Sequence, residues 1–130
     1  MQNECLIPPA DMKWVAFGQG IDFSLLYTST ETGRWAVMFR CQPGSFFGPH
    51  RHLGAGEYYV VKGRMVYRMG EATEGSYGYE PLDAVHDHTS FPQYTELLFI
   101  NHGPVAFLDE EGGVATVVDH SMLKTMYEGK

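Results

Sequence analysis

Short apolar runs alternate along the chain with glycine- and proline-rich turns, at a spacing typical of proteins built from many short strands. The runs are rich in β-branched and aromatic residues, which favour strands over helices. Tight hairpins are predicted at Lys62-Gly63 and at Glu111-Gly112-Gly113, because glycine adopts a positive φ without strain. The predicted strands cover residues 34–40, 57–63, 64–69, 95–101, 105–109 and 114–119.

Helical spacing is confined to residues 121–127, near the end of the chain. The sequence has no internal repeat, linker or low-complexity segment. A chain of 130 residues can bury about two-thirds of its unfolded surface in one core. We therefore predict one all-β domain over residues 1–130, a sandwich or small barrel that ends in a short helix.

The charge, the apolar runs and the cysteines of the chain indicate which partners and which compartment to expect. Sixteen acidic residues oppose nine basic ones, and the net charge of −7 disfavours binding to nucleic acid or anionic membranes. No apolar run approaches the roughly 20 residues of a membrane span, and the first residues lack the apolar core of a signal peptide. The only cysteines, Cys5 and Cys41, do not suggest a disulfide framework, so we expect a cytoplasmic protein.

Candidate metal ligands gather in residues 43–63, PGSFFGPHRHLGAGEYYVVKG. In a strand, His50 and His52 point to the same face, about 6.6 Å apart along the chain. The chain can bend after them and bring Glu57 back to the same ion. His86 follows a turn-like segment and is the third imidazole expected at this site.

Two groups of residues resemble the sequence motifs of the cupins. The first group is Gly44, His50, His52, Glu57 and Gly63, and the second is Gly75 or Gly78, Pro81 and His86. The resemblance implies a double-stranded β-helix barrel that holds one divalent metal on inward-facing histidines.

Three further segments resemble the small cupins that cleave carbon–carbon bonds with iron and dioxygen. These segments are residues 74–89, 99–113 and 118–127, and the similarity extends over about residues 14–127. The relatives include the 2,4'-dihydroxyacetophenone dioxygenases and the acetylacetone-cleaving enzymes. The resemblance implies an Fe(II)-dependent dioxygenase that cleaves a C–C bond beside a carbonyl in a small hydroxyketone or diketone.

The chain departs from the cupin motifs at three places. Glu57 is followed by five residues before Gly63, one fewer than usual, while Asp83 replaces a glycine and Ser90 an asparagine. Two roles therefore remain open for Glu57. It is either a mobile ligand that leaves the metal and acts as the catalytic base, or an acceptor that fixes the tautomer of a histidine.

The sequence gives less support for His88, His102 and His120 as metal ligands. His88 lies two residues after His86 and is expected to share its strand face, so it can assist or replace His86. His102 is expected to be exposed in a turn, and His120 to cap a helix or lie at the surface. Anion binding or surface solubility remain open as roles of Arg40 and Arg64.

Two other functions use the same residues. With Zn, Ni or Mn as a Lewis acid, the site would suit a redox-neutral isomerase or lyase. It would also suit a non-catalytic metal-binding module. A homodimer or larger assembly is expected, because short strands leave sheet edges exposed. The resemblance to the cupins implies that the N-terminal segment covers a partner's sheet edge, and residues 5–17 are apolar enough to do so.

Overall fold

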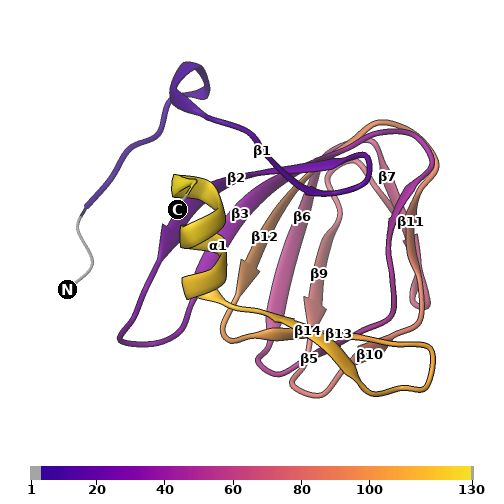
Figure 1. Ribbon diagram of the computed structural model, residues 1–130. Coiled ribbons are helices and arrows are strands. Elements are labelled where there is room, and N and C mark those ends of the chain that lie inside the picture. Colours follow the sequence, from indigo (N-terminus) through magenta and orange to yellow (C-terminus); the bar gives the residue numbers. More distant parts are fainter. Residues whose placement is uncertain (1–3, 130) are drawn as a thin grey trace.

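The computed structural model describes residues 4–129, which fold mainly into β-strands (Figure 1). The strands of the first half are β1 (Val15–Gly18), β2 (Ile21–Thr28), β3 (Trp35–Cys41), β4 (Ser45–Phe47), β5 (His50–His52), β6 (Gly56–Lys62) and β7 (Arg64–Tyr67). Those of the second half are β8 (Gly70–Thr73), β9 (Tyr77–Glu80), β10 (Val85–His86), β11 (Thr89–Phe91), β12 (Thr95–Asn101), β13 (Val105–Leu108) and β14 (Val114–Val118). A short 3-10 helix (Pro9–Asp11) precedes them, and α1 (His120–Glu128) follows them.

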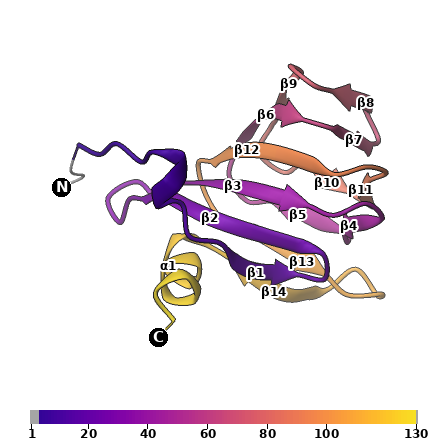
Figure 2. The ribbon, with the colours of Figure 1, turned by 90° about the horizontal axis from the view of Figure 1, so that it is seen from above.

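The strands form three sheets that enclose one core (Figures 1 and 2). The largest sheet has the order β1-β2-β3-β12-β6-β9, and the two smaller ones have the orders β10-β5-β13-β14 and β4-β11-β7-β8. All pairings between neighbouring strands are antiparallel. The predicted all-β barrel with a short C-terminal helix is confirmed.

Alternation along the strands separates the core from the surface. In β12, Leu97 and Phe99 are buried, whereas Leu98 and Ile100, which alternate with them, are only partly buried on the outer face. Aromatic rings fill the interior, where Phe39 makes edge-to-face contacts with Phe47 at 5.1 Å between ring centroids. Such contacts add about 0.5–1.5 kcal/mol each to the free energy gained by burial.

Gly63 marks a corner between two sheets and does not form the predicted hairpin. The strands on either side of it belong to different sheets, since β6 pairs with β12 and β9 while β7 pairs with β8 and β11. The φ of Gly63 is +92°, and a Cβ there would lie 2.3 Å from the carbonyl oxygen of Tyr94. The second predicted hairpin is confirmed, because β13 and β14 pair across the turn that contains Gly112.

α1 is fixed at both ends. The Asp119 side chain caps its first turn by accepting a hydrogen bond from the Met122 amide at 2.8 Å, and Gly129 ends it in the left-handed conformation. Leu123 is fully buried against the barrel. The Tyr127 hydroxyl donates to the Lys13 carbonyl oxygen at 2.9 Å, which joins the helix to the segment before β1. Among residues 4–129, no helix is long and apolar enough to cross a membrane.

Candidate metal centre

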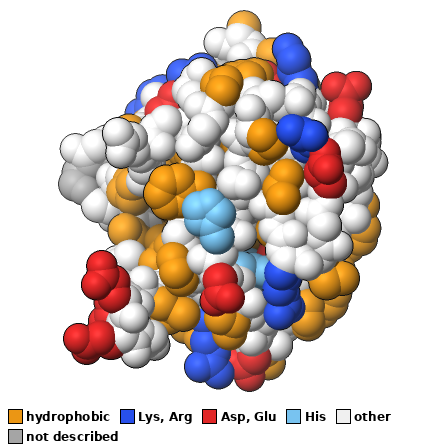
Figure 3. Space-filling model, turned by 90° about the vertical axis from the view of Figure 1, so that its right-hand side faces the viewer, with side chains coloured by type: hydrophobic (Ala, Val, Ile, Leu, Met, Phe, Trp, Pro, Cys, Tyr) orange, Lys and Arg blue, Asp and Glu red, His pale blue; other side chains and the backbone are white. Residues whose placement is uncertain are grey.

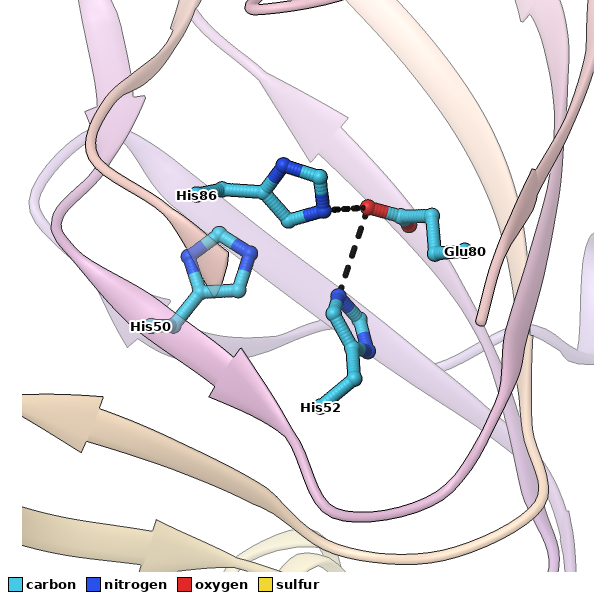
Figure 4. Close-up of side chains that lie close together, drawn as sticks. All are labelled: His50, His52, Glu80 and His86. Carbon is cyan, nitrogen blue, oxygen red and sulfur yellow. Dashed lines mark ion pairs between the residues drawn. The ribbon is translucent and has the colours of Figure 1, made fainter. Parts of the chain in front are cut away.

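Two adjacent strands bring three histidines together inside the barrel (Figure 4). His50 and His52 alternate with Arg51 in β5, so both imidazoles point inward while Arg51 points outward and pairs with Asp83. β10 lies beside β5, and His86 pairs directly with His50 in the register of the two strands. The exposed fractions are 6% for His50, 0% for His52 and 2% for His86, so the three imidazoles form one buried group.

A buried carboxylate completes this group. Glu80 ends β9, and its Oε2 lies 2.5 Å from Nε2 of His86 and 3.3 Å from Nε2 of His52 (Figure 4). One nitrogen or oxygen from each of the four residues falls within 4.8 Å of the others, as a single metal ion requires. Sequence reasoning missed Glu80, although strict alternation in β9 (Tyr77–Glu80) places every second residue, including Glu80, on the inner face.

Glu57 does not belong to this group, and its predicted place at the metal is corrected. Its neighbour Tyr58 in β6 is buried, so Glu57 points to the outer face of the six-stranded sheet. There its carboxylate accepts a hydrogen bond from the Tyr77 hydroxyl at 2.6 Å and lies 3.0 Å from Nε2 of His102. These hydrogen bonds lower the pKa of Glu57. A carboxylate on this face does not reach the buried histidines or the interior of the barrel.

The pKa shifts of His50 and Glu80 suit a cation. Burial lowers the pKa of His50 to about 4, so its imidazole is neutral at pH 7. Nδ1 of His50 lies 2.8 Å from the Gly48 carbonyl oxygen; with the proton on Nδ1, Nε2 is left free to bind a metal. Burial alone would raise the pKa of Glu80, but its contacts with His52 and His86 outweigh burial and lower the pKa to about 2.

The unpaired nitrogens of the buried group also fit a metal. Both ring nitrogens of His52 and of His86 are buried without a well-aligned hydrogen bond in the described structure. Buried polar atoms are normally satisfied, and each one that is not costs about 1–3 kcal/mol. A divalent ion bound by three neutral imidazoles, with the anionic Glu80 in contact with two of them, would satisfy a nitrogen on each ring.

The other predicted candidates lie outside the group. His88 is exposed and stacks on the Phe46 ring at 5.0 Å, because the chain turns away between His86 and β11. His120 is the first residue of α1, and Asp119 rather than His120 caps the helix.

The two arginines considered for anion binding are paired with acidic residues. Ion pairs join Arg40 to Asp22 and Arg64 to Glu71. Figure 3 shows the face on the side of β7 and β11, where acidic and basic side chains are scattered among hydrophobic ones.

A small apolar chamber adjoins the imidazoles of His50 and His52. Its cavity volume is about 20 Å³, enough for about one water molecule. Its other walls are Phe17, Trp35, Phe39, Phe47, Phe99, Val105, Phe107 and Val118. Any molecule that reaches the histidines from this side therefore meets apolar surfaces.

The chain is similar to proteins that act on acetylacetone. It is 41% identical over 101 residues to an acetylacetone-cleaving enzyme of Acinetobacter johnsonii; the aligned region covers 73% of this chain and spans 66% of the relative's length. The crystal structure of an acetylacetone dioxygenase from Acinetobacter johnsonii matches 99% of this chain and 93% of that one, with a TM-score of 0.89 and 31% identity. A proposed acetylacetone dioxygenase from Methylibium petroleiphilum PM1 matches 98% of this chain and 96% of its own, with a TM-score of 0.92 and 32% identity.

A more distant structure shares only the fold. The complex of SigE with the anti-sigma ChrR of Rhodobacter sphaeroides contains a chain that matches 72% of this chain; the match covers 51% of that chain, with a TM-score of 0.64 and 18% identity.

A family match covers most of the sequence. The family of ChrR cupin-like domains matches residues 2–106 of the chain. The protein therefore belongs to the ChrR cupin-like family of the cupin superfamily.

Proposed function

We propose that this protein is a mononuclear, metal-dependent dioxygenase that cleaves a carbon–carbon bond beside a carbonyl in a small diketone or hydroxyketone. The observation that carries the proposal is the buried group of His50, His52, Glu80 and His86 beside an apolar chamber. The similarity to acetylacetone-cleaving enzymes supports the same class of reaction. The metal we propose is Fe(II), and Zn, Ni and Mn remain alternatives because imidazole binds all of them.

The histidines have the primary role at this centre. His50, His52 and His86 are the proposed ligands, and their neutral imidazoles are the form that binds metals. When bound, Fe(II) supplies the electron transfer between an enolate substrate and dioxygen. Glu80 is ionised at neutral pH because of its low pKa, and its Oε2 lies beside Nε2 of His52 and of His86, so it balances part of the metal's charge.

The chamber favours a small, neutral and largely apolar substrate. Aromatic and aliphatic side chains line it, and the only polar side chains at its wall, within residues 4–129, are His50, His52 and the indole of Trp35. The Trp35 Nε1–H already donates to the Gly103 carbonyl oxygen at 3.0 Å, so it does not compete for a substrate. Once the walls have moved apart to admit it, a diketone can present its oxygens to the metal and its alkyl groups to the walls.

Anaerobic purification followed by metal analysis and an oxygen-uptake assay tests the proposal. The Fe(II)-loaded protein should consume one O2 for each β-diketone or aryl α-hydroxyketone that disappears. Protein loaded with Zn(II) should bind the same compounds without consuming oxygen.

Two other results would contradict the dioxygenase proposal and support one of the alternative functions. Isomerisation by the Zn, Ni or Mn form, without oxygen uptake by the iron form, would establish the Lewis-acid function instead. Stoichiometric metal without turnover of any compound in the panel would favour a non-catalytic module.

We also propose that the protein is a cytoplasmic homodimer. Cys5 and Cys41 are not bridged, which fits a reducing compartment. The segment before β1 carries Leu6, which is 89% exposed, and it projects away from the barrel (Figure 1). Exposed apolar side chains of this kind favour burial against a partner. Sedimentation at micromolar concentration should give the mass of a dimer, and a monomer would contradict this proposal.

A further inference from the structure

The barrel has a seam between two edge strands. β1 is the last strand of the six-stranded sheet, and β14 is the last strand of the sheet that contains β5 and β10. Within residues 4–129, β1 pairs only with β2 and β14 only with β13, so no ladder joins the two edges. In the view of Figure 2, both strands lie on the side of the molecule where α1 is found. A small molecule can pass between them without breaking hydrogen bonds between paired strands.

An apolar groove lies at this seam. Its cavity volume is about 310 Å³, and its outer walls include Ile21, Thr116, Met122 and Met126. Four side chains line both this groove and the chamber beside the metal-binding histidines. These four, which we call the partition, are Phe17, Phe47, Phe107 and Val118. The groove and the chamber are therefore neighbouring spaces on the two sides of the partition.

The chamber is too small to hold the proposed substrate unless the partition moves. It has room for about one water molecule, whereas a β-diketone such as acetylacetone has a five-carbon chain and two oxygens. The groove, in contrast, is about 310 Å³. A substrate that binds in the groove must displace part of the partition to reach His50 and His52.

Phe17 is the partly buried member of the partition that lies in an edge strand, and its ring packs against those of Phe23, Phe39, Phe47 and Phe107. Phe47 and Val118 are buried, with 8% and 3% of their surfaces exposed, and Phe107 lies in a strand that is paired on both sides. Phe17 is only partly buried and belongs to an edge strand. The pairing of that strand shifts between Ala16 and Gly18, directly at Phe17.

α1 is a fixed wall of the groove. Lys13 Nζ donates to the Tyr127 carbonyl oxygen at 2.6 Å, in addition to the bond from the Tyr127 hydroxyl to Lys13. These bonds and the buried Leu123 hold the helix in place, so its movement is not needed to open the groove. Met122 and Met126 face the groove, and flexible thioether side chains adapt to apolar ligands of different shapes.

We propose that apolar carbonyl compounds reach the metal centre through the seam between β1 and β14, and that Phe17 is the gate of this route. Which compounds use this route depends on the proposed function. The route itself is inferred from the four side chains that line both the groove and the chamber. Phe17 acts on the rate of access and on the width of ligand admitted. It does not contact the metal and is not a catalytic residue.

Met122→Trp tests the route because it fills the groove without touching the chamber. The metal-loaded protein is mixed without oxygen with acetylacetone or with 4-phenylimidazole, and binding is followed by stopped-flow absorption. We expect the association and dissociation rates to fall together by about tenfold, with metal content and equilibrium affinity unchanged. Phe17→Leu should have the opposite effect and speed the association of benzoylacetone more than that of acetylacetone.

Met69→Trp is the matched control. Met69 is 76% exposed and lines a separate cleft beside Tyr58 and Tyr67, so its substitution should leave the association rates unchanged. Slower association in Met69→Trp, with normal rates in Met122→Trp, would overturn the proposal and move the route to that cleft. Normal rates together with altered sedimentation of Met122→Trp would also overturn it, since the seam would then be an interface between two copies.

The two probes separate this proposal from the proposed function. 4-Phenylimidazole is an apolar metal ligand, and its binding does not depend on any cleavage reaction. If diketones are not cleaved but Met122→Trp slows the binding of 4-phenylimidazole, the route stands and the proposed function fails. If diketones are cleaved but Met122→Trp leaves both probes unaffected, the function stands and the route fails.

Discussion

His50, His52, His86 and Glu80 form a buried group in which one carboxylate contacts two of the three imidazoles. The three histidines come from β5 and β10, which are held in register by their pairing. A barrel built in this way fixes the direction of each imidazole before a metal arrives. The group should therefore lose its metal when one imidazole is removed, because the neighbouring strands offer no replacement.

The first prediction concerns these three histidines. His50→Ala, His52→Ala and His86→Ala should each lower the metal content of the purified protein to near zero, measured by elemental analysis. His88→Ala and His102→Ala should retain the metal, because both side chains lie outside the buried group. Full metal occupancy in His86→Ala would show that another residue supplies the third imidazole or its equivalent.

The second prediction separates Glu80 from Glu57. Glu80→Gln removes the charge in contact with His52 and His86, and we expect metal affinity to fall about 10–100-fold, as for other groups that orient metal ligands. Glu57→Gln should leave metal affinity and turnover unchanged, because Glu57 is bonded to Tyr77 and His102 on the outer face. Competition with a chelator measures both affinities, and a larger loss in Glu57→Gln than in Glu80→Gln would contradict this assignment.

At the scale of elements, Gly63 lets the chain pass from one sheet to another. β6 belongs to the large sheet and β7 to a smaller one, so a sharp corner is needed between them. Gly63 has a positive φ and also lies against the backbone of Tyr94 and Thr95. Among the described glycines with positive φ, only Gly63 would bring an added Cβ within 3.0 Å of other atoms, so this corner is sensitive to substitution.

The third prediction compares two glycines with similar φ angles. Gly112→Ala, at φ +83° with open space around it, should cost about 1–2 kcal/mol of unfolding free energy from backbone strain alone. Gly63→Ala has the same strain and also a Cβ that would lie 2.3 Å from the Tyr94 carbonyl oxygen, so it should cost about 1–3 kcal/mol more. Urea unfolding of both variants measures the difference. Equal losses would mean that the corner relaxes without cost.

At the scale of the whole molecule, the buried group links folding to pH. Burial lowers the pKa of His50 from 6.5 to about 4, so between these pH values the unfolded chain binds a proton that the folded protein does not. Stability is therefore lost as the pH falls from 6.5 to 4. For Glu80, the contacts with His52 and His86 lower the pKa from 4.5 to about 2, and the stability that this provides is lost as the pH falls from 4.5 to 2.

The fourth prediction follows from that linkage. The metal-free protein should lose roughly 3 kcal/mol of unfolding free energy between pH 6.5 and 4 through His50, at about 1.4 kcal/mol per unit of pKa shift. His50→Gln should remove this part of the pH dependence, measured by urea unfolding at a series of pH values. His88→Gln, a change at an exposed histidine, should keep the wild-type dependence, and the same slope in His50→Gln would contradict the assignment.

The sequence by itself determined the all-β class, six of the strands, the C-terminal helix and the three histidines that the structure gathers into one buried group. These features are local. Alternation decides which residues form a strand, and His50 and His52 share a face because they are two residues apart. His86 could be added because a turn-like segment precedes it.

Only the tertiary structure decided which carboxylate joins the histidines. Glu57 lies near the start of β6 and Glu80 at the end of β9, and a shift of one residue in register exchanges the inner and outer faces. Alternation in β9 puts Glu80 on the same face as Gly78, but only the pairing of β6 with β9 and β12 decides which face is the inner one. The same is true of the corner at Gly63 and of the seam between β1 and β14, because both depend on which strands become neighbours in space.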